Sequence, residues 1–210
     1  MRLDTFLIKK GYFRSRNRAK IAIRQGLVVV DGKIAVKPSI EVDEDVEIKI
    51  LDDKPAGYWK LREIDEKFFI FKGDEIVLDL GSSVGGFLLY ASEKAKFVYG
   101  IEINEEFEEE LKRVEEERKN VKIFIENVFT FDIDKIDPVN LILNDLTMDF
   151  SSSMKALKRF LPKLKNGKIL FVAKGDEEVD FSDFQVLAFD VAKKKKESYY
   201  LIEPKMRKLI

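Results

Sequence analysis

The sequence predicts an α/β protein in which a largely parallel sheet with helices on both faces follows a small α+β module. Three observations carry this prediction. Strand-like and helix-like runs alternate between residues 75 and 173, whereas residues 1–51 carry two short helical patterns and a hairpin pattern. Between these regions, residues 52–57 read Asp-Asp-Lys-Pro-Ala-Gly, which is typical of a linker. We therefore expect domains at residues 1–51 and 58–210.

The composition restricts the chemistry that the chain can perform. Its 210 residues include no cysteine and no histidine, which excludes disulfides, thiolate metal sites and the usual general base. Catalysis would have to depend on Asp, Glu, Lys, Tyr or Ser, and we expect no metal site. No apolar run or N-terminal signal marks the chain for a membrane or for export, so we expect a cytoplasmic protein with no membrane partner. Abundant Lys, Glu and Ile are typical of proteins from hot environments, so we expect a thermophilic source.

The first module is predicted to contain two helices, a hairpin and a further strand. Residues 3–11 place apolar side chains on one helical face and end at a glycine. A second helix begins at about Ser15, ends near Gly26, and is predicted to bury Ala19, Ile21 and Ala22. Residues 27–36 read as a hairpin around an Asp-Gly turn, and residues 46–51 as a strand.

Positive charge is concentrated in this module. Up to residue 40, ten Lys and Arg residues are opposed by only Asp4 and Asp31. Guanidiniums spaced along a helix suit RNA phosphates, although a solvated basic helix face is the alternative interpretation. The candidate RNA-binding residues are Arg14, Arg16, Arg18, Lys20, Arg24 and Lys33.

The second region is predicted to form the main sheet. The expected strands are residues 75–80, 97–101, 121–126, 141–144 and 168–173, and the expected helices are residues 88–94, 105–119 and 154–163. Two final strands, at residues 184–192 and 198–202, would close one edge of the sheet.

A glycine-rich turn after the first of these strands predicts a cofactor site. The sequence Asp79-Leu-Gly-Ser-Ser-Val-Gly-Gly-Phe87 lacks the Gly-x-Gly-x-x-Gly spacing of dinucleotide sites and has an acidic residue before its glycines. This pattern favours S-adenosylmethionine, with Asp79 at its ammonium group, Glu102 at its ribose hydroxyls and Asn127 at its adenine. A pyrophosphate cradle and a plain strand-to-helix turn are the alternatives. The candidate cofactor-binding residues are Asp79, Gly81, Ser82, Gly85, Gly86, Phe87, Glu102, Asn127 and Asp145.

Two family resemblances follow from these motifs. The helix-helix-hairpin order, the Arg14-x-Arg-x-Arg-x-Lys20 run and the sequence Gly26-x-Val-x-Val-Asp-Gly-Lys33 resemble the S-four RNA-binding domain. The remainder resembles the FtsJ-like ribose methyltransferases, and the pairing is similar to the TlyA family of ribosomal RNA 2′-O-methyltransferases. The resemblance implies a Rossmann-like S-adenosylmethionine-dependent methyltransferase domain acting on RNA, with ribosomal RNA or a ribosomal subunit as the expected partner.

The FtsJ-like resemblance also implies a catalytic Lys-Asp-Lys-Glu tetrad. Its members here are Lys60 in Tyr-Trp-Lys-Leu-Arg-Glu-Ile, Asp145 in Leu-Ile-Leu-Asn-Asp-Leu, Lys174 in Leu-Phe-Val-Ala-Lys-Gly, and Glu197 in Lys-Glu-Ser-Tyr-Tyr-Leu. We expect Lys174 to be the general base, with a pKa lowered by burial and by a neighbouring lysine. Asp145 would orient Lys174, Lys60 would position the hydroxyl, and Glu197 would hold Lys60. Alternatively, Asp145 caps a turn and Glu197 pairs with the Lys193–Lys196 run.

Some features depart from the family pattern. The approach to Lys60 is short, and Gly-Asp-Glu follows Lys174 where TlyA-like chains usually have a proline. The loop after this lysine normally frames the substrate, so the identity of the target is left open, as is the oligomeric state. A base methyltransferase is disfavoured because Asn144-Asp-Leu-Thr147 lacks a Pro-Pro-aromatic sequence. A non-catalytic RNA-binding or ribosome-assembly factor is the alternative from another functional class.

Overall fold

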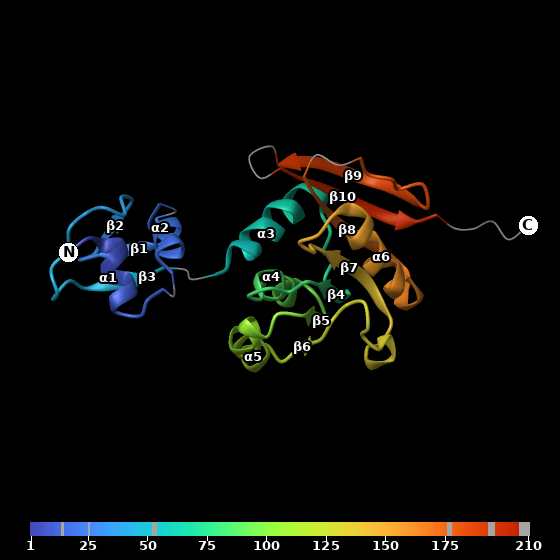
Figure 1. Ribbon diagram of the computed structural model, residues 1–210, viewed down its shortest axis with the longest axis horizontal. Helices are drawn as coiled ribbons and strands as arrows, with labels where there is room; N and C mark the ends of the chain where they lie inside the picture. The colour runs from blue at the N-terminus through green and yellow to red at the C-terminus, as the bar shows by residue number, and fades with distance from the viewer. Residues whose placement is uncertain (14, 25, 52–53, 176–177, 193–195, 206–210) are drawn as a thin grey trace, which may run out of the picture. The chain divides into compact units, whose positions relative to one another are not determined.

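The computed structural model describes residues 1–13, 15–24, 26–51, 54–175, 178–192 and 196–205. It divides into two compact units, Met1–Lys54 and Pro55–Ile210, each shown in Figure 1. The second unit opens with a helix that begins at Ala56, so the last two residues of the predicted linker are the first two residues of this helix. Among the described residues, no helix combines the length and apolar character needed to cross a bilayer.

The first unit contains two helices and a three-stranded antiparallel sheet of order β2-β1-β3. Its elements are α1 (Leu3–Lys9), α2 (Arg16–Arg24), β1 (Val28–Val30), β2 (Lys33–Ala35) and β3 (Ile48–Ile50). The predicted hairpin is present, because Val30 pairs with Lys33 across a two-residue turn. Asp31 and Gly32 both have positive φ there, which is the backbone that an Asp-Gly turn favours.

The predicted buried face of α2 is wrong at one position. Ala19 and Ala22 are buried as expected, but Ile21 is 41% exposed and Ile23 is fully buried. With 3.6 residues per turn, Ala19, Ala22 and Ile23 share one helical face, whereas Ile21 lies well away from it. The small core therefore joins one face of α2 to apolar residues of α1 and β1, including Leu3, Phe6 and Val28.

The second unit is built on a seven-stranded sheet of order β6-β5-β4-β7-β8-β10-β9. Its strands are β4 (Ile76–Leu80), β5 (Phe97–Glu102), β6 (Val121–Ile125), β7 (Val139–Asn144), β8 (Leu164–Lys174), β9 (Phe184–Ala192) and β10 (Glu197–Pro204). The first five are mutually parallel, and β10 is antiparallel to both β8 and β9. The prediction of a parallel sheet with two final strands at one edge is confirmed.

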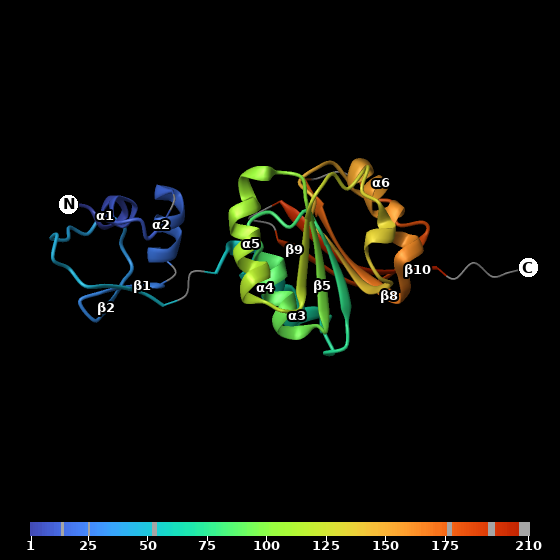
Figure 2. The ribbon, with the colours of Figure 1, turned by 90° about the horizontal axis from the view of Figure 1, so that it is seen from below.

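Helices cover both faces of this sheet, as Figure 2 shows. They are α3 (Ala56–Phe68), α4 (Gly86–Lys94), α5 (Glu108–Glu117) and α6 (Phe150–Phe160), with short 3₁₀ helices at Glu105–Phe107, Ile133–Lys135 and Leu161–Lys163. One core packs α3, α4 and α5 against the sheet, and a second core packs α6 against the opposite face. Successive residues of a central strand enter different cores; in β4, for example, Val77 lies in the first and Leu78 in the second.

Helix α3 was not anticipated as a helix. Tyr58, Leu61 and Ile64 recur every three residues and are all buried, which is the pattern of a helix packed on one side. The helix ends at Phe69, which adopts a left-handed conformation and is exposed. Since Lys60 lies on α3, this helix decides where that lysine reaches.

Candidate active site

Lys60, Asp145, Lys174 and Glu197 come from four elements and meet at one end of the sheet. Lys174 is the last residue of β8 and Glu197 is the first residue of β10, and the two are register partners. Asp145 follows β7 directly, and Lys60 reaches it from α3. The structure thus brings together all four side chains that were assigned to catalysis.

The four side chains form a closed ring of alternating charges. Nζ of Lys60 lies 2.8 Å from Oδ2 of Asp145 and 2.9 Å from Oε2 of Glu197. Nζ of Lys174 lies 2.8 Å from Oε1 of Glu197 and also donates a hydrogen bond to Oδ1 of Asp145. Each carboxylate therefore bridges both lysines. We expected Glu197 to hold Lys60, and it contacts both Lys60 and Lys174.

Burial differs between the two lysines. The Lys60 side chain is 9% exposed, whereas that of Lys174 is 24% exposed. A substrate hydroxyl approaching from solvent therefore has freer access to Lys174. Lys60 is further enclosed by aromatic rings, since its Nζ lies 5.8 Å from the centre of the Phe87 ring and 5.7 Å from that of Tyr199.

The electrostatic environment shifts the pKa values of the two lysines in opposite directions. Burial, together with the positive charge of Lys174, lowers the pKa of Lys60 despite its contacts with Asp145. Burial also acts to lower the pKa of Lys174, but Asp145 and Glu197 outweigh it and raise that pKa. Burial acts to raise the pKa of Glu197, yet its hydrogen bonds to Lys174 and Lys60 bring it down to about 2. The expected lowering of the Lys174 pKa is thus wrong for this arrangement, because two carboxylates contact its ammonium group.

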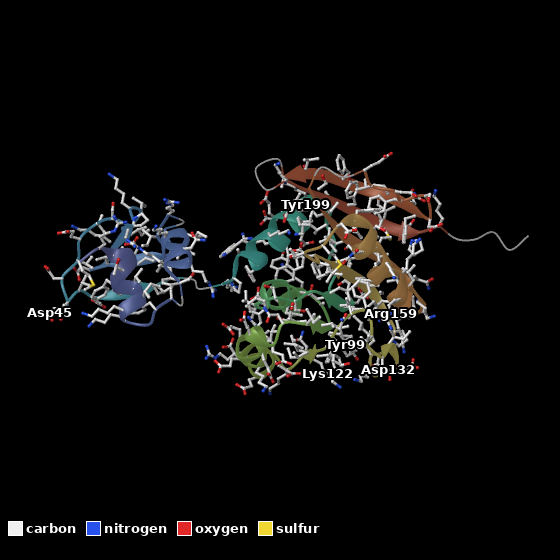
Figure 3. The ribbon with its side chains drawn as sticks, in the orientation of Figure 1. Asp45, Tyr99, Lys122, Asp132, Arg159 and Tyr199 are labelled. Carbon is white, nitrogen blue, oxygen red and sulfur yellow. The ribbon has the colours of Figure 1, made fainter. Side chains whose placement is uncertain are left out.

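Tyr199 also belongs to this cluster, although its sequence context did not indicate it. Its hydroxyl donates a hydrogen bond to Oε2 of Glu197 at 3.2 Å, and Figure 3 marks it on the strand that passes beside α3. Burial and the nearby Glu197 carboxylate raise the pKa of Tyr199, so the hydroxyl stays protonated and available as a donor. The two-residue spacing from Glu197 was the available signal, since residues i and i+2 of a strand face the same side.

Asp79 is a fully buried carboxylate on β4, the strand adjacent to β7. Neither of its side-chain oxygens has a hydrogen-bond partner among the described residues. Burial raises the pKa of Asp79 to about 8, and the negative charges of Asp145 and Glu102 add to this effect. A buried carboxylate without a partner is costly, so this position fits a cationic ligand group.

A side chain at any of three glycines in the turn after β4 would collide with neighbouring protein atoms. Gly81 and Gly85 both have positive φ, and a Cβ would lie 2.9 Å from a methyl carbon of Leu146 or Val114, respectively. A Cβ on Gly86 would lie 2.7 Å from the backbone nitrogen of Tyr58. We expected Gly85 and Gly86 to admit a ligand, and the structure supplies another reason for Gly86, which lets α4 approach α3. Ser82 and Phe87, also assigned to the cofactor, are both buried.

Glu102 and Asn127 both take part in local hydrogen bonds. Glu102 ends β5 and accepts the backbone N–H groups of Ser83 at 2.7 Å and Asn104 at 2.8 Å, one at each oxygen. Each carboxylate oxygen can accept a further hydrogen bond, so Glu102 can both brace the turn and receive a ribose hydroxyl. Asn127 follows β6, and its side-chain oxygen accepts the N–H of Phe129 at 2.9 Å.

The predicted RNA-binding residues of the first unit have unequal surroundings. Arg24 and Lys33 are exposed, Arg18 and Lys20 are half-buried, and Arg14 lies outside the described residues. Arg16 is exposed, but its Nε lies 3.1 Å from Oδ2 of the buried Asp4. The Ser15 hydroxyl accepts the backbone N–H of Arg18 at 3.3 Å, which is the contact of a helix cap. In the part of the chain that the structure describes, no acidic cluster suited to a metal ion is present.

Comparison with known families assigns both units. The FtsJ-like methyltransferase model matches residues 56–204, and the S4 domain model matches residues 1–48. The chain is 31% identical over 107 residues to a candidate rRNA methyltransferase of Bacillus subtilis, YqxC, covering 49% of this chain and 38% of that protein. It is 35% identical over 91 residues to the 16S/23S rRNA (cytidine-2′-O)-methyltransferase TlyA of Mycobacterium tuberculosis, covering 41% and 34%. These matches thus span well under half the length of either relative.

Solved structures share the fold at low sequence identity. A candidate hemolysin from Streptococcus thermophilus superposes with a TM-score of 0.61 at 20% identity, covering 97% of this chain and 88% of that chain. A candidate methyltransferase from Streptococcus mutans, solved in complex with SAH, gives a TM-score of 0.53 at 17% identity, covering 68% and 97%. These similarities support the architecture described above.

Proposed function

The chain belongs to the FtsJ-like methyltransferase family, and from that premise we propose that it is an S-adenosylmethionine-dependent RNA 2′-O-methyltransferase whose substrate is ribosomal RNA. The observation that carries the proposal is the closed ring of four charged side chains at the carboxyl ends of the parallel strands, formed by Lys60, Asp145, Lys174 and Glu197. The S4 domain match over residues 1–48 and the rRNA methyltransferase relatives support an RNA substrate. We assign RNA binding to the first unit and catalysis to the second.

The residues around the glycine turn fit S-adenosylmethionine. When bound, this cofactor supplies a methyl group activated on a positively charged sulfur. The carboxylate of Asp79, buried and without a partner among the described residues, suits the cofactor's ammonium group. Glu102 keeps acceptor capacity for ribose hydroxyls, and we propose that Asn127 meets the adenine edge.

The tetrad provides the proton chemistry that a ribose hydroxyl needs. A 2′-hydroxyl becomes an effective nucleophile only when a base accepts its proton as the new carbon–oxygen bond forms. We assign that base to Lys174, because it is the more exposed of the two lysines. Its ammonium group must first lose a proton to solvent, and Asp145 and Glu197 make this harder because they raise its pKa. The hydroxyl proton then passes to the neutral Nζ of Lys174.

The other three members position the reacting groups. Asp145 and Glu197 each bridge both lysines, so they fix the distance between Lys60 and Lys174. The buried Lys60 then presents a fixed donor to the ribose oxygen. Correct alignment of reactants lowers a barrier by about 7–11 kcal/mol in favourable cases, so this positioning contributes strongly to the rate.

The decisive experiment compares ribose methylation in ribosomal RNA from cells with and without the gene by mass mapping. We expect one or more 2′-O-methyl groups to be lost on deletion and restored by the wild-type gene, but not by Lys174→Ala or Lys174→Arg. Arginine keeps the positive charge yet cannot accept a proton, so it separates base chemistry from electrostatic contact. Lys165→Ala, at an exposed position on the same strand, is the matched control and should restore methylation.

Two outcomes would overturn the proposal. If Lys174→Arg restores most of the methylation, Lys174 serves only as an electrostatic contact and is not the base. If deletion leaves every ribose methyl group in place, and purified protein binds RNA and S-adenosylmethionine without transferring a methyl group, the chain is a non-catalytic RNA-binding factor.

A further inference from the structure

Asp4 is a fully buried carboxylate in the first unit that two arginines share. Arg2 donates to it through Nε and Nη2, each at 3.0 Å, and Arg16 donates through Nε at 3.1 Å. The Thr5 hydroxyl adds a longer contact of 3.4 Å. One buried carboxylate thus contacts both guanidiniums, Arg2 through two nitrogens and Arg16 through one.

The two arginines retain unused binding capacity. A guanidinium has five N–H donors, of which Arg2 uses two on Asp4 and Arg16 uses one. Their side chains are 45% and 53% exposed, so the remaining donors can reach solvent. Asp4 neutralises one positive charge and leaves the pair with a net positive charge.

Other charges nearby modify this patch. Lys20 lies one helical turn beyond Arg16 on α2 and adds positive charge to the same side. Glu41 forms an isolated backbone bridge with Arg2 and is exposed, so it opposes an anion at the Arg2 side. A ligand for this patch therefore has to use the fixed geometry of the guanidiniums as well as their charge.

We propose that Arg2 and Arg16, anchored on Asp4, form a phosphate site for the RNA backbone, with Asp4 as the positioning residue. Two planar forks held in place suit phosphate oxygens, because little side-chain freedom remains to be lost on binding. Arg2 is then an RNA contact outside the basic run of α2. The inference rests on the proposed function, since it takes RNA as the partner.

Asp4→Asn tests the proposed site, because attraction by charge alone and an anchored phosphate site predict opposite changes in RNA affinity. The variant adds one unit of positive charge to the module but removes the ionic anchor. If charge alone attracts RNA, the full-length variant binds more tightly than wild type. The anchored site predicts weaker binding, by about tenfold, the effect of one charge-assisted contact. Binding is measured by fluorescence anisotropy with a labelled RNA stem-loop of mixed sequence.

Two further variants keep the test informative if Asp4→Asn unfolds the module. Arg2→Lys preserves the charge and loses the fork, so we expect it to weaken binding several-fold. Lys9→Gln removes a charge that is paired with Glu44 on the same unit, and it should change affinity much less. Hydrogen exchange in peptides from α1 reports whether each variant keeps the module folded.

The outcomes separate this inference from the proposed function. If wild type does not bind the stem-loop, the RNA-binding function itself fails. If wild type binds but folded Asp4→Asn binds as tightly or more tightly, or if folded Arg2→Lys binds like wild type, then Asp4 and its arginines only stabilise the fold and the phosphate site is refuted.

Discussion

Asp4 in the first unit and Asp79 in the second are both completely buried, yet their surroundings differ in a way that separates structure from function. Hydrogen bonds from Arg2 hold the pKa of Asp4 far below its usual range, and Arg16 adds to the effect. Burial instead raises the pKa of Asp79 to about 8, and neither of its side-chain oxygens has a hydrogen-bond partner among the residues that the structure describes. The chain itself supplies the counter-charge of Asp4, and we propose that the ammonium group of the cofactor supplies that of Asp79.

The tetrad lies between these extremes. Asp145 and Glu197 are paired with the chain's own lysines, and one of these, Lys174, has to change its protonation state in the proposed reaction. The group that neutralises a buried carboxylate therefore indicates its role. A permanently charged side chain indicates a structural role, a side chain that changes its protonation state indicates catalysis, and a ligand indicates binding.

The largest effect is expected at Asp145. Asp145→Asn should lower the single-turnover methylation rate by about 10²-fold, the cost of misplacing reacting groups by about 1 Å, because both lysines lose a bridging partner. It should also move the rise of the rate with pH to lower pH, since one of the two carboxylates that raise the Lys174 pKa is gone. A merely structural Asp145 would lower the rate without moving the pH profile.

Cofactor affinity should depend on pH through Asp79, which is the next largest effect. With its pKa raised to about 8, Asp79 is protonated in the free protein at neutral pH, and binding a cationic ammonium group expels that proton. The affinity should therefore rise by up to about tenfold per pH unit between about pH 6 and pH 8, and level off above that. Calorimetry in two buffers with different ionisation enthalpies should detect release of a proton.

Asp79→Asn is the control for this linkage. The amide has nearly the same shape but cannot ionise, so any titration of the cofactor itself remains while the protein's contribution disappears. The variant should bind the cofactor less tightly than wild type at pH 8 and nearly as well at pH 6. Equal pH slopes for both proteins would show that Asp79 does not titrate on binding.

The sequence predicted the positions of the tetrad better than its electrostatics. The resemblance to FtsJ-like methyltransferases identified the four residues, and the apolar runs placed Asp145 and Lys174 at the ends of predicted strands. The pKa direction of Lys174 was missed because it depends on two carboxylates at hydrogen-bonding distance, one of them 23 residues away in the chain. Glu102 is similar, since bonds to the backbone of Ser83 and Asn104 cannot be read from residue types.

In the first unit, the sequence showed an excess of positive charge but not which basic side chains pair with acidic ones. Ten basic residues against two acids indicated an exposed cationic face, yet one of those acids is the buried anchor of Arg16, 12 residues away. The assignment of Ile21 to the core failed for a related reason. The phase of a short helix is set by the elements that it packs against, and these are distant in sequence.

Asp4 should make the stability of the first unit sensitive to acid, and this effect should be smaller than those expected at Asp145 and Asp79. A carboxyl whose pKa is lowered by folding stabilises the folded state above its unfolded pKa of about 4, and this contribution disappears as the pH falls further. We expect a loss of about 1 kcal/mol, because both guanidiniums are half-exposed to solvent. Hydrogen exchange of α1 peptides, followed from neutral to acidic pH, should show it, and Asp4→Asn should flatten the curve.

The smallest effect is expected at Tyr199. Tyr199→Phe keeps the ring beside Lys60 and removes only the hydrogen bond to Glu197, which is long at 3.2 Å. Glu197 remains bound to both lysines, so the rate should fall by no more than about fivefold, consistent with one hydrogen bond of about 1 kcal/mol. Tyr199→Leu removes the ring as well and should lower the rate further, because Lys60 loses its contact with the aromatic face.

Single-turnover rates at saturating cofactor measure both variants. If Tyr199→Phe alone is as damaging as Asp145→Asn, the hydroxyl takes part in proton transfer, and a chain of donors would have to replace the closed ring as the basis of the mechanism.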